Sequence, residues 1–487
     1  MGMTGARRNE AEIALLEGYL SEAGAGWIGL CGPSGVGRRT LLTRVLEGHP
    51  EAIVLRGAPL SDEDLLGDFT ALLERSLGGV PRPSGPGWLP EPGGRASWTQ
   101  LLLGLADRSA ERGRTILLVL EEWDLFVRVR RSLAVELAEA LDRAGRRGGR
   151  LRVVLTYRAG LEERRGEVPG SEVLPAPVGI VRLGHLPPRE AGWLQGAGEP
   201  EDAFFRWALL GGRADQLPGP GREGQSWEEA VVERVLRRGG DLNDRPLRRL
   251  EGAFQRPERY GALLRALALG PMSWSELVAS TGGVEGGGQI APYLRRLEEE
   301  GWVTAVSPLG ASSRSRNRRY RLTDPFDAFW YACVLPVRHE LLHRDPRRLW
   351  DERVKPTLDA HLDRWLPVAV ASWFRAHAGE LFRAEGREVG GLWGEAGDFP
   401  VVAWLTNGQI CYVHTRWRPG GSGEEEFEAL EEAIRATRYG IGREARTPVL
   451  ATSGEVGPAL RSRVRGHTLA QLLGPAELMG TGPVADG

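Results

Sequence analysis

The sequence predicts a multidomain α/β protein whose first domain contains a doubly wound parallel sheet. Its 487 residues are more than one hydrophobic core supports, so we expect about three or four domains. Short apolar strands alternate with helical patterns between Trp27 and Leu183, which is typical of a parallel sheet with helices on both faces. A glycine-rich loop joins the first strand to the first helix, which is where such sheets bind their ligands.

The composition narrows the class of protein. The formal net charge is -2, so no overall field attracts nucleic acid, and any such surface must be local. Cys31, Cys333 and Cys411 are the only cysteines and lie far apart, which excludes a disulfide framework and a paired-cysteine zinc site. The sequence has no apolar run of about 18 residues and no leader pattern. We therefore expect a cytoplasmic protein without a membrane partner.

The elements of the first domain follow from apolar runs and turn residues. Strands are predicted at 27–31, 52–56, 115–122, 151–156 and 179–183. Helices are predicted at 38–46 and 61–77, and the segment 78–94, rich in Pro and Gly, is predicted to be a surface loop.

The segment from Gly32 to Thr40 has the glycine spacing of a P-loop with both chemically active positions changed. Arg38 stands at the position of the phosphate-binding lysine, and Arg39 stands at the position of the Mg²⁺-binding hydroxyl. Thr40 comes one residue too late to replace it. Lys355 is the only lysine among 63 basic residues, so Arg38 fits a general exchange of lysine for arginine, whereas Arg39 does not.

Backbone N–H groups at a helix N-terminus can hold phosphate without a particular side chain. ATP or another nucleotide is therefore the candidate cofactor, and Mg²⁺ is not expected because Arg39 removes an oxygen ligand. The candidate nucleotide-binding residues are Gly32, Gly35, Val36, Gly37, Arg38, Arg39 and Thr40.

The apolar strand that starts at Thr115 ends in two acidic residues, as in a Walker B segment. Glu121 takes the metal-coordinating position and Glu122 the position of the general base. The alternative is that both residues only end a strand at the solvent edge. Arg158, Arg182 and Arg213 are either phosphate sensors or surface residues.

The middle of the chain predicts helices and then a winged helix. A helical region covers 188–250, and three helices follow at 260–269, from Ser273 and at 290–300. Strands at 302–306 and 319–322 enclose a basic loop, which completes the winged-helix pattern. The candidate DNA-binding residues on this wing are Arg314, Arg316, Arg318 and Arg319. Gly286 to Gly288 precede the third helix where base-reading side chains would be needed, so a packing module is an equal alternative.

The last part of the chain predicts helices to about Phe382 and then a second α/β domain. Asn407-Gly408 is a strong hairpin signal between strands at 398–405 and 409–417. A helix at 424–437, a strand at 448–452 and a helix near 468–473 are expected to follow.

The order of these pieces resembles the prokaryotic P-loop ATPases called archaeal-type DEXX-box ATPases, within the STAND class. Beyond the P-loop and the Walker B strand, the resemblance rests on Leu210–Leu217, Tyr293–Leu297 and Tyr320–Phe326, and it covers about residues 20 to 475. It implies a P-loop NTPase core, a helical lid, a winged helix and a C-terminal domain similar to restriction endonucleases.

In that family, the nuclease-like domain carries a metal-binding aspartate and a Glu-x-Lys pair. These positions match Asp398, His414 and Arg416. Arginine cannot lose a proton to act as a base, and histidine is a poor ligand for Mg²⁺. The resemblance therefore implies a degenerate nuclease site that holds no metal.

The predicted domains are the NTPase core at 1–185, the lid at 186–250, the winged helix at 251–323, a helical connector at 324–382, the nuclease-like domain at 383–475 and a disordered tail at 476–487. Three functions fit this sequence. The first is a nucleotide-binding switch or scaffold with weak or no hydrolysis, associated with DNA or an unidentified protein partner. The second is an active ATPase that drives a conformational cycle, and the third is an interaction module that needs no nucleotide.

Overall fold

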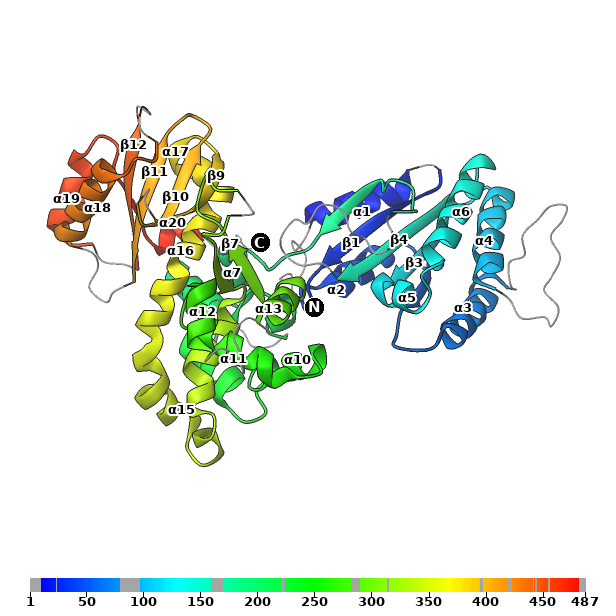
Figure 1. Cartoon of the computed structure of the whole chain (residues 1–487), viewed down its shortest axis with the longest axis horizontal. Helices are drawn as coiled ribbons and strands as arrows, with labels where there is room; N and C mark the ends of the chain where they lie inside the picture. The colour runs from blue at the N-terminus through cyan, green and yellow to red at the C-terminus, as the bar shows by residue number, and fades with distance from the viewer. Residues whose placement is uncertain are drawn as a thin grey trace. The chain divides into compact units, whose positions relative to one another are not determined.

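The computed structural model divides the chain into two compact units, Gly2–Gly184 and His185–Gly487 (Figure 1). The residues that it describes are 10–22, 24–78, 97–158, 170, 172–219, 224–281, 290–312, 315–394, 397–417, 423–440, 442, 445–453 and 456–480. The predicted surface loop at 78–94 lies outside the described residues, apart from Gly78.

The first unit contains a five-stranded sheet with the order β2-β3-β4-β1-β5. All four neighbouring pairs of strands are parallel. The strands are β1 (Gly26–Gly32), β2 (Ile53–Arg56), β3 (Ile116–Glu121), β4 (Leu151–Arg158) and β5 (Gly179–Arg182). All five predicted strands are thus confirmed, with small shifts at their ends. Residues of β1, β3 and β4 are buried almost without exception, which explains their continuous apolar sequence.

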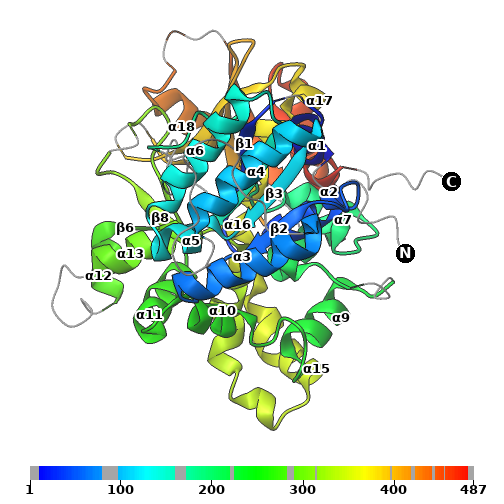
Figure 2. The ribbon, with the colours of Figure 1, turned by 90° about the vertical axis from the view of Figure 1, so that its right-hand side faces the viewer.

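Helices cover both faces of this sheet. On one face, α1 (Glu10–Ser21) and α2 (Arg38–Leu46) pack into one apolar cluster. On the other face a second apolar cluster joins the sheet to α5 (Trp123–Val129) and to three longer helices. These are α3 (Asp62–Leu77), α4 (Trp98–Arg112) and α6 (Leu133–Arg146). Figure 2 shows these helices in front of the sheet. Ser61 caps α3 by accepting a hydrogen bond from the Asp64 N–H group, as the start of the predicted helix requires.

The second unit begins with short helices. They are α7 (Pro188–Leu194), α8 (Pro200–Leu210), α9 (Trp227–Val231) and α10 (Arg245–Ala253), with a 3₁₀ turn at Ala214–Gln216 and a π-helical turn at Val232–Leu236. Arg213 is fully buried there and pairs with Asp215, Asp324 and Asp327. Burial alone would lower the pKa of Arg213, but these carboxylates raise it. Arg213 is therefore part of a buried ionic cluster, and the sequence-based alternative of a surface residue is wrong for it.

Three helices and a three-stranded antiparallel sheet follow, with the strand order β6-β8-β7. The helices are α11 (Pro257–Leu267), α12 (Trp274–Ser280) and α13 (Ile290–Glu299), and the strands are β6 (Met272–Ser273), β7 (Val303–Val306) and β8 (Arg319–Leu322). Ser273 caps α12 in a capping box with Glu276. Gly301 has a φ of 72° just after α13, as a glycine after a helix C-terminus commonly has.

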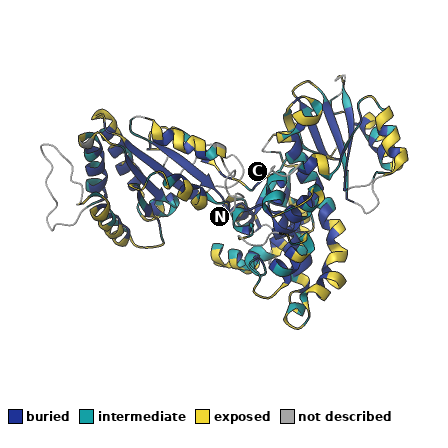
Figure 3. Cartoon of the chain, turned by 180° about the vertical axis from the view of Figure 1, so that it is seen from behind, coloured by how far each residue is buried: buried dark blue, intermediate teal, exposed yellow. Residues whose placement is uncertain are grey.

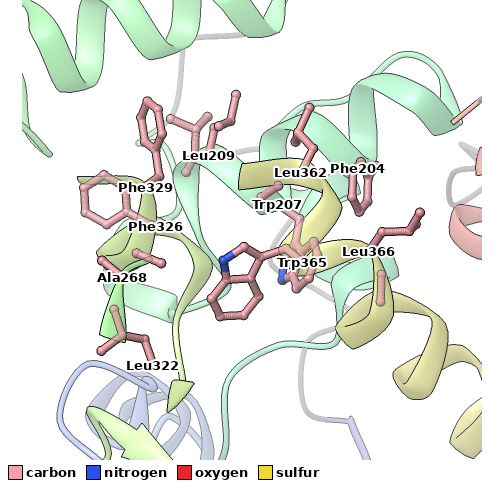
Figure 4. Close-up of a cluster of buried hydrophobic side chains, with 14 of the residues drawn as sticks. Phe204, Trp207, Leu209, Ala268, Leu322, Phe326, Phe329, Leu362, Trp365 and Leu366 are labelled. Carbon is pink, nitrogen blue, oxygen red and sulfur yellow. The ribbon is translucent and has the colours of Figure 1, made fainter. Parts of the chain in front are cut away.

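A helical segment connects this sheet to the last one. It contains α14 (Pro325–Phe329), α15 (Pro346–Leu349), the long helix α16 (Leu358–Ala376), α17 (Ala378–Phe382) and the short turns between 330 and 357. Asp324 caps α14 by accepting a hydrogen bond from the Phe326 N–H group. Around Trp365 of α16, aromatic and aliphatic side chains from α8, α14 and α16 pack into one core (Figure 4).

The C-terminal sheet has five strands in the order β13-β12-β11-β10-β9. The strands are β9 (Gly386–Leu392), β10 (Phe399–Leu405), β11 (Ile410–Arg416), β12 (Arg446–Thr452) and β13 (Gln471–Leu473). The pairs among β9, β10 and β11 are antiparallel, and those among β11, β12 and β13 are parallel. Helix α16 packs on one face, and α18 (Glu424–Ala436) and α19 (Pro458–Gly466) pack on the other. The central strands of both large sheets are mostly buried, whereas the edge strand β9 is mostly half-buried or exposed. Exposed residues lie mainly on the outer sides of the helices (Figure 3).

Two predictions for the C-terminal end are wrong. The helix expected near 468–473 is instead strand β13, because Gln471 to Leu473 pair in parallel with β12 and three residues are too few to show a helical period. The tail predicted to be disordered from 476 onward includes helix α20 (Pro475–Met479), whose Leu478 and Met479 are buried. The indole Nε1 of Trp193 donates to the Met479 carbonyl over 2.9 Å and fixes this helix. Residues 481–487 of the predicted tail lie outside the described residues.

Within the described residues, no helix has the length and apolar character needed to cross a bilayer.

Candidate functional site

The loop between β1 and α2 has the backbone of a phosphate cradle. Gly32, Gly35 and Gly37 have φ values of 155°, 88° and 92°, which other residues rarely adopt. A Cβ atom on Gly32 would lie 2.2 Å from the Leu183 carbonyl oxygen, so only glycine fits there. Gly37 is the N-cap of α2 and offers no side-chain cap, which leaves the first N–H groups of the helix for an anion.

This loop joins the first strand of a parallel sheet to the following helix. The fold is that of P-loop NTPases. In this P-loop NTPase fold, the side chains at the ends of β3 and β4 lie at the same edge of the sheet as the loop. The candidate catalytic residues at that edge are Glu121 and Glu122.

Glu122 is held by two arginines of the same edge. Arg38 Nη2 lies 3.3 Å from Glu122 Oε1, and Arg158 Nε lies 3.2 Å from Oε2. The Arg38 side chain is only 10% exposed, so this contact is largely shielded from water. Burial lowers the pKa of Arg38, an effect that Glu122 opposes and Arg158 adds to. Both oxygens of the predicted general base are thus occupied by guanidinium groups.

The backbone at Glu122 is unusual. Its φ of 58° and ψ of 49° place it in the left-handed region, where it begins α5. Its N–H group donates to Thr156 Oγ1 over 3.0 Å, which ties the end of β3 to β4. Non-glycine residues in this conformation cost energy and occur often at functional sites. The strained position directs the carboxylate toward Arg38.

The remaining predicted P-loop residues point elsewhere. Arg39 and Thr40 are exposed on α2, while Val36 is buried. Glu121 lies 3.9 Å from Arg56, whose side chain is 56% exposed, so that contact is weak. Arg182 lies 3.8 Å from the sulfur of Cys31, in the strand before the loop. The structure therefore brings Arg38, Glu122 and Arg158 together and leaves Arg39 and Thr40 outside this group.

Two residues near this site were not identified from the sequence. Asp124 interacts electrostatically with Arg38, and its buried Oδ1 has no hydrogen-bond partner among the described residues. Burial raises the pKa of Cys31, and the hydrogen bond from Tyr157 acts in the opposite direction. Asp124 lies two positions after Glu122. Its acidic side chain so close to the Walker B pair is the sequence signal that could have identified it.

The three residues of the second predicted site do not all line one cavity. Asp398 lines a cavity in the second unit, and His414 and Arg416 are not among the lining residues. Burial lowers the pKa of His414, while Glu426 opposes this effect. The buried His414 Nε2 and Arg416 Nε have no hydrogen-bond partner in the part of the chain that the structure describes. We find no contact that joins these three residues into a site.

The predicted wing contacts the C-terminal sheet. The Trp393 indole, directly after β9, donates to the Asn317 carbonyl over 3.1 Å, and Arg319 lies over its ring at 5.0 Å. The Leu309 N–H group also donates to the Gly391 carbonyl of β9. Arg316 is exposed, Arg318 is half-buried, and Arg314 lies outside the described residues. Of the candidate DNA-binding arginines, Arg319 is thus committed to an internal contact.

Among the described residues, no group of three or more His, Cys, Asp or Glu side chains could hold a metal ion.

No protein-family model and no curated protein matches this chain. Solved structures with a similar fold include the Walker-type ATPase of Pyrococcus abyssi, which is 17% identical with a TM-score of 0.45 and covers 66% of this chain and 95% of its own. The Aeropyrum pernix ORC2 protein in its ADPNP–ADP complexes is 16% identical with a TM-score of 0.38, over 71% of this chain and 96% of its own. Drosophila ORC bound to DNA is 12% identical with a TM-score of 0.30, over 70% of this chain and 86% of its own.

Proposed function

We propose that the P-loop unit binds ATP or another nucleotide and that the chain acts as a nucleotide-binding switch or scaffold with weak or no hydrolysis. The observation that carries this proposal is the ion pair between Arg38 and Glu122 beside a complete glycine cradle. The cradle supplies backbone donors for phosphate, and the pair removes the carboxylate that hydrolysis would use.

Hydrolysis in a P-loop site needs a polar group that orients the attacking water and a metal that neutralises the developing charge. Both oxygens of Glu122 already accept from Arg38 and Arg158. The hydroxyl that would bind Mg²⁺ is replaced by Arg39, which is exposed on α2. Arg38 can still contact a phosphate, because a guanidinium fork suits phosphate oxygens.

Titration calorimetry with ATP, with and without Mg²⁺, tests the binding step. We expect binding that changes little when Mg²⁺ is removed. No heat and no thermal shift at millimolar ATP would refute both nucleotide-dependent functions and leave the interaction module.

A phosphate-release assay on Arg38→Lys combined with Arg39→Thr tests the loss of hydrolysis. We expect the double variant to turn over ATP faster than the natural chain. Strong phosphate release by the natural chain, abolished in Glu122→Gln, would instead establish the active ATPase. The single variant Arg39→Thr is the matched control for changes on α2 alone.

For the second unit we propose that 186–250 is a lid, 251–323 a winged helix, 324–382 a connector and 383–475 a nuclease-like domain without nuclease activity. His414 and Arg416 at the positions of the Glu-x-Lys pair support the last part, because arginine cannot act as a base and histidine is a poor ligand for Mg²⁺. Incubation of the chain with duplex DNA and Mg²⁺ tests it, and metal-dependent cleavage would contradict it.

The contacts of Asn317 and Arg319 with Trp393 favour a packing role for the wing over DNA recognition. Charge reversal at Arg316 and Arg318 should then leave duplex affinity unchanged. A marked loss of affinity would instead indicate that the wing binds DNA.

A further inference from the structure

A cavity of about 450 Å³ lies in the second unit, and no residue of the proposed nucleotide site is among its lining residues. Its walls come from α11, β8, α16, β9 and the start of β10. Most of the lining is apolar, including Ala268 and Leu322 of the core (Figure 4). The volume falls in the range of small-molecule sites, which is about 300–1,000 Å³.

Four arginines line this cavity, against one carboxylate. They are Arg319, Arg321, Arg364 and Arg375, and the carboxylate is Asp398. No described carboxylate lies within ion-pair distance of any of the four. Glu276 and Asp363 attract Arg319 and Arg364 only at longer range. Among the described residues that line it, the cavity therefore has an excess of positive charge.

The protein satisfies only part of the hydrogen-bonding capacity of these groups. Arg364 donates to the Leu269 carbonyl over 3.2 Å, and Arg375 donates to the Val389 carbonyl over 3.0 Å. Arg364 Nε is buried and has no partner among the described residues. A guanidinium has five N–H donors, so each keeps donors for a ligand.

The charge lowers the stability of the empty site. Loss of hydration and the nearby charge of Arg375 lower the pKa of Arg321 to about 10. Burial also lowers the pKa of Arg364. Arg321 and Arg364 are half-buried, whereas Arg375 is exposed. Cations that are shielded from water are normally paired, so the two half-buried guanidinium groups favour an anionic ligand.

Two tryptophans, Trp365 and Trp393, also line the cavity beside the arginines. Arg319 lies over the ring of Trp393 at 5.0 Å, and Arg321 lies over Trp365 at 6.0 Å. Trp365 also packs edge-on against Trp207, with ring centroids 5.9 Å apart, in the core of α8 and α16 (Figure 4). A planar ring of a ligand could stack on such surfaces beside the guanidinium groups.

We propose that this cavity binds a small aromatic phosphate ester of the size of a nucleoside monophosphate. A carboxylate would neutralise only one of the arginines, whereas a phosphate monoester carries about -1.5 to -2 charges and three acceptor oxygens. The apolar walls and the two tryptophans would hold the aromatic part. This site is separate from the P-loop and does not rest on the nucleotide-binding function proposed above.

Titration calorimetry of the full chain with AMP tests the proposal, because AMP lacks the β- and γ-phosphates that a P-loop holds. We expect Arg321→Gln and Arg364→Gln each to weaken AMP binding by about tenfold or more. Arg387→Gln, at an exposed arginine of β9 that does not line the cavity, is a control that should leave the affinity unchanged. Inorganic phosphate and adenosine, each alone, should bind more weakly than AMP.

Ala371→Trp provides a second variant, since it fills the cavity and keeps all four arginines. It should abolish AMP binding while the chain stays folded by circular dichroism. Arg321→Gln without ligand should be at least as heat-stable as the natural chain, because it removes an uncompensated cation. The proposal is overturned if AMP does not bind at millimolar concentration, if AMP affinity survives Arg321→Gln, or if a 5′-phosphorylated single-stranded oligonucleotide binds and AMP does not.

Discussion

Glu122→Gln removes the negative charge that faces Arg38 and Arg158 and should have two opposite effects. At 3.3 Å, the attraction between Arg38 and Glu122 is about 5 kcal/mol for an effective dielectric constant of about 20. The pair with Arg158 adds little, because the Arg158 side chain is 42% exposed. The net pKa of Arg38 is lowered despite Glu122, so burial costs this guanidinium more than the pair returns.

The variant therefore leaves a shielded cation without its partner. Breaking a fully buried pair costs about 3 to 5 kcal/mol, and the residual exposure of both groups reduces this to about 2 to 3 kcal/mol. For a unit of this size the melting temperature should fall by about 4 to 12 °C. ATP affinity should rise about tenfold, because the phosphates no longer compete with Glu122 for Arg38.

Calorimetric scanning without ligand and titration with ATP measure the two effects. Glu121→Gln is the matched control, since its contact with the exposed Arg56 is 3.9 Å long, and both readings should stay near those of the natural chain. A variant with unchanged melting temperature and unchanged ATP affinity would refute the ion pair and the reasoning built on it.

Two further predictions concern the second unit. Asp327→Asn should lower the unfolding free energy by about 3 kcal/mol, because Asp327 accepts hydrogen bonds from the buried Arg213 and Arg249. Chemical denaturation measures this change. As a control, Glu352→Gln at an exposed ion pair should cost under about 1 kcal/mol. Burial lowers the pKa of His361 to about 3, so the unfolded chain takes up a proton below about pH 6.5 that the folded chain does not. The contribution of His361 to stability should be full above pH 6.5 and fall toward pH 3. Between these values, His361→Leu should reduce the slope of unfolding free energy against pH by about 1.4 kcal/mol per pH unit. An exposed His361 would not produce this change.

Local signals predicted much of the fold. Continuous apolar runs gave the parallel strands, and Ser61 and Ser273 cap the helices whose starts they mark. The glycines at 32, 35 and 37 have positive φ values that their spacing implied. Local patterns failed for the shortest element, the three-residue strand β13. Its residues form a strand only because β12 lies beside them.

The sequence by itself determined the order of elements and the residue types at the P-loop, because caps, turns and strand periods act over a few neighbouring residues. Only the tertiary structure decided what the changed residues do. Arg38 and Glu122 are 84 positions apart and meet because β1 and β3 each pair with β4 in the same parallel sheet. The same holds for Arg321 and Arg364, which line one cavity from β8 and α16. Charges separated along the chain affect one another only after folding removes the water between them, so the altered P-loop and the arginine cavity acquire their chemistry from packing.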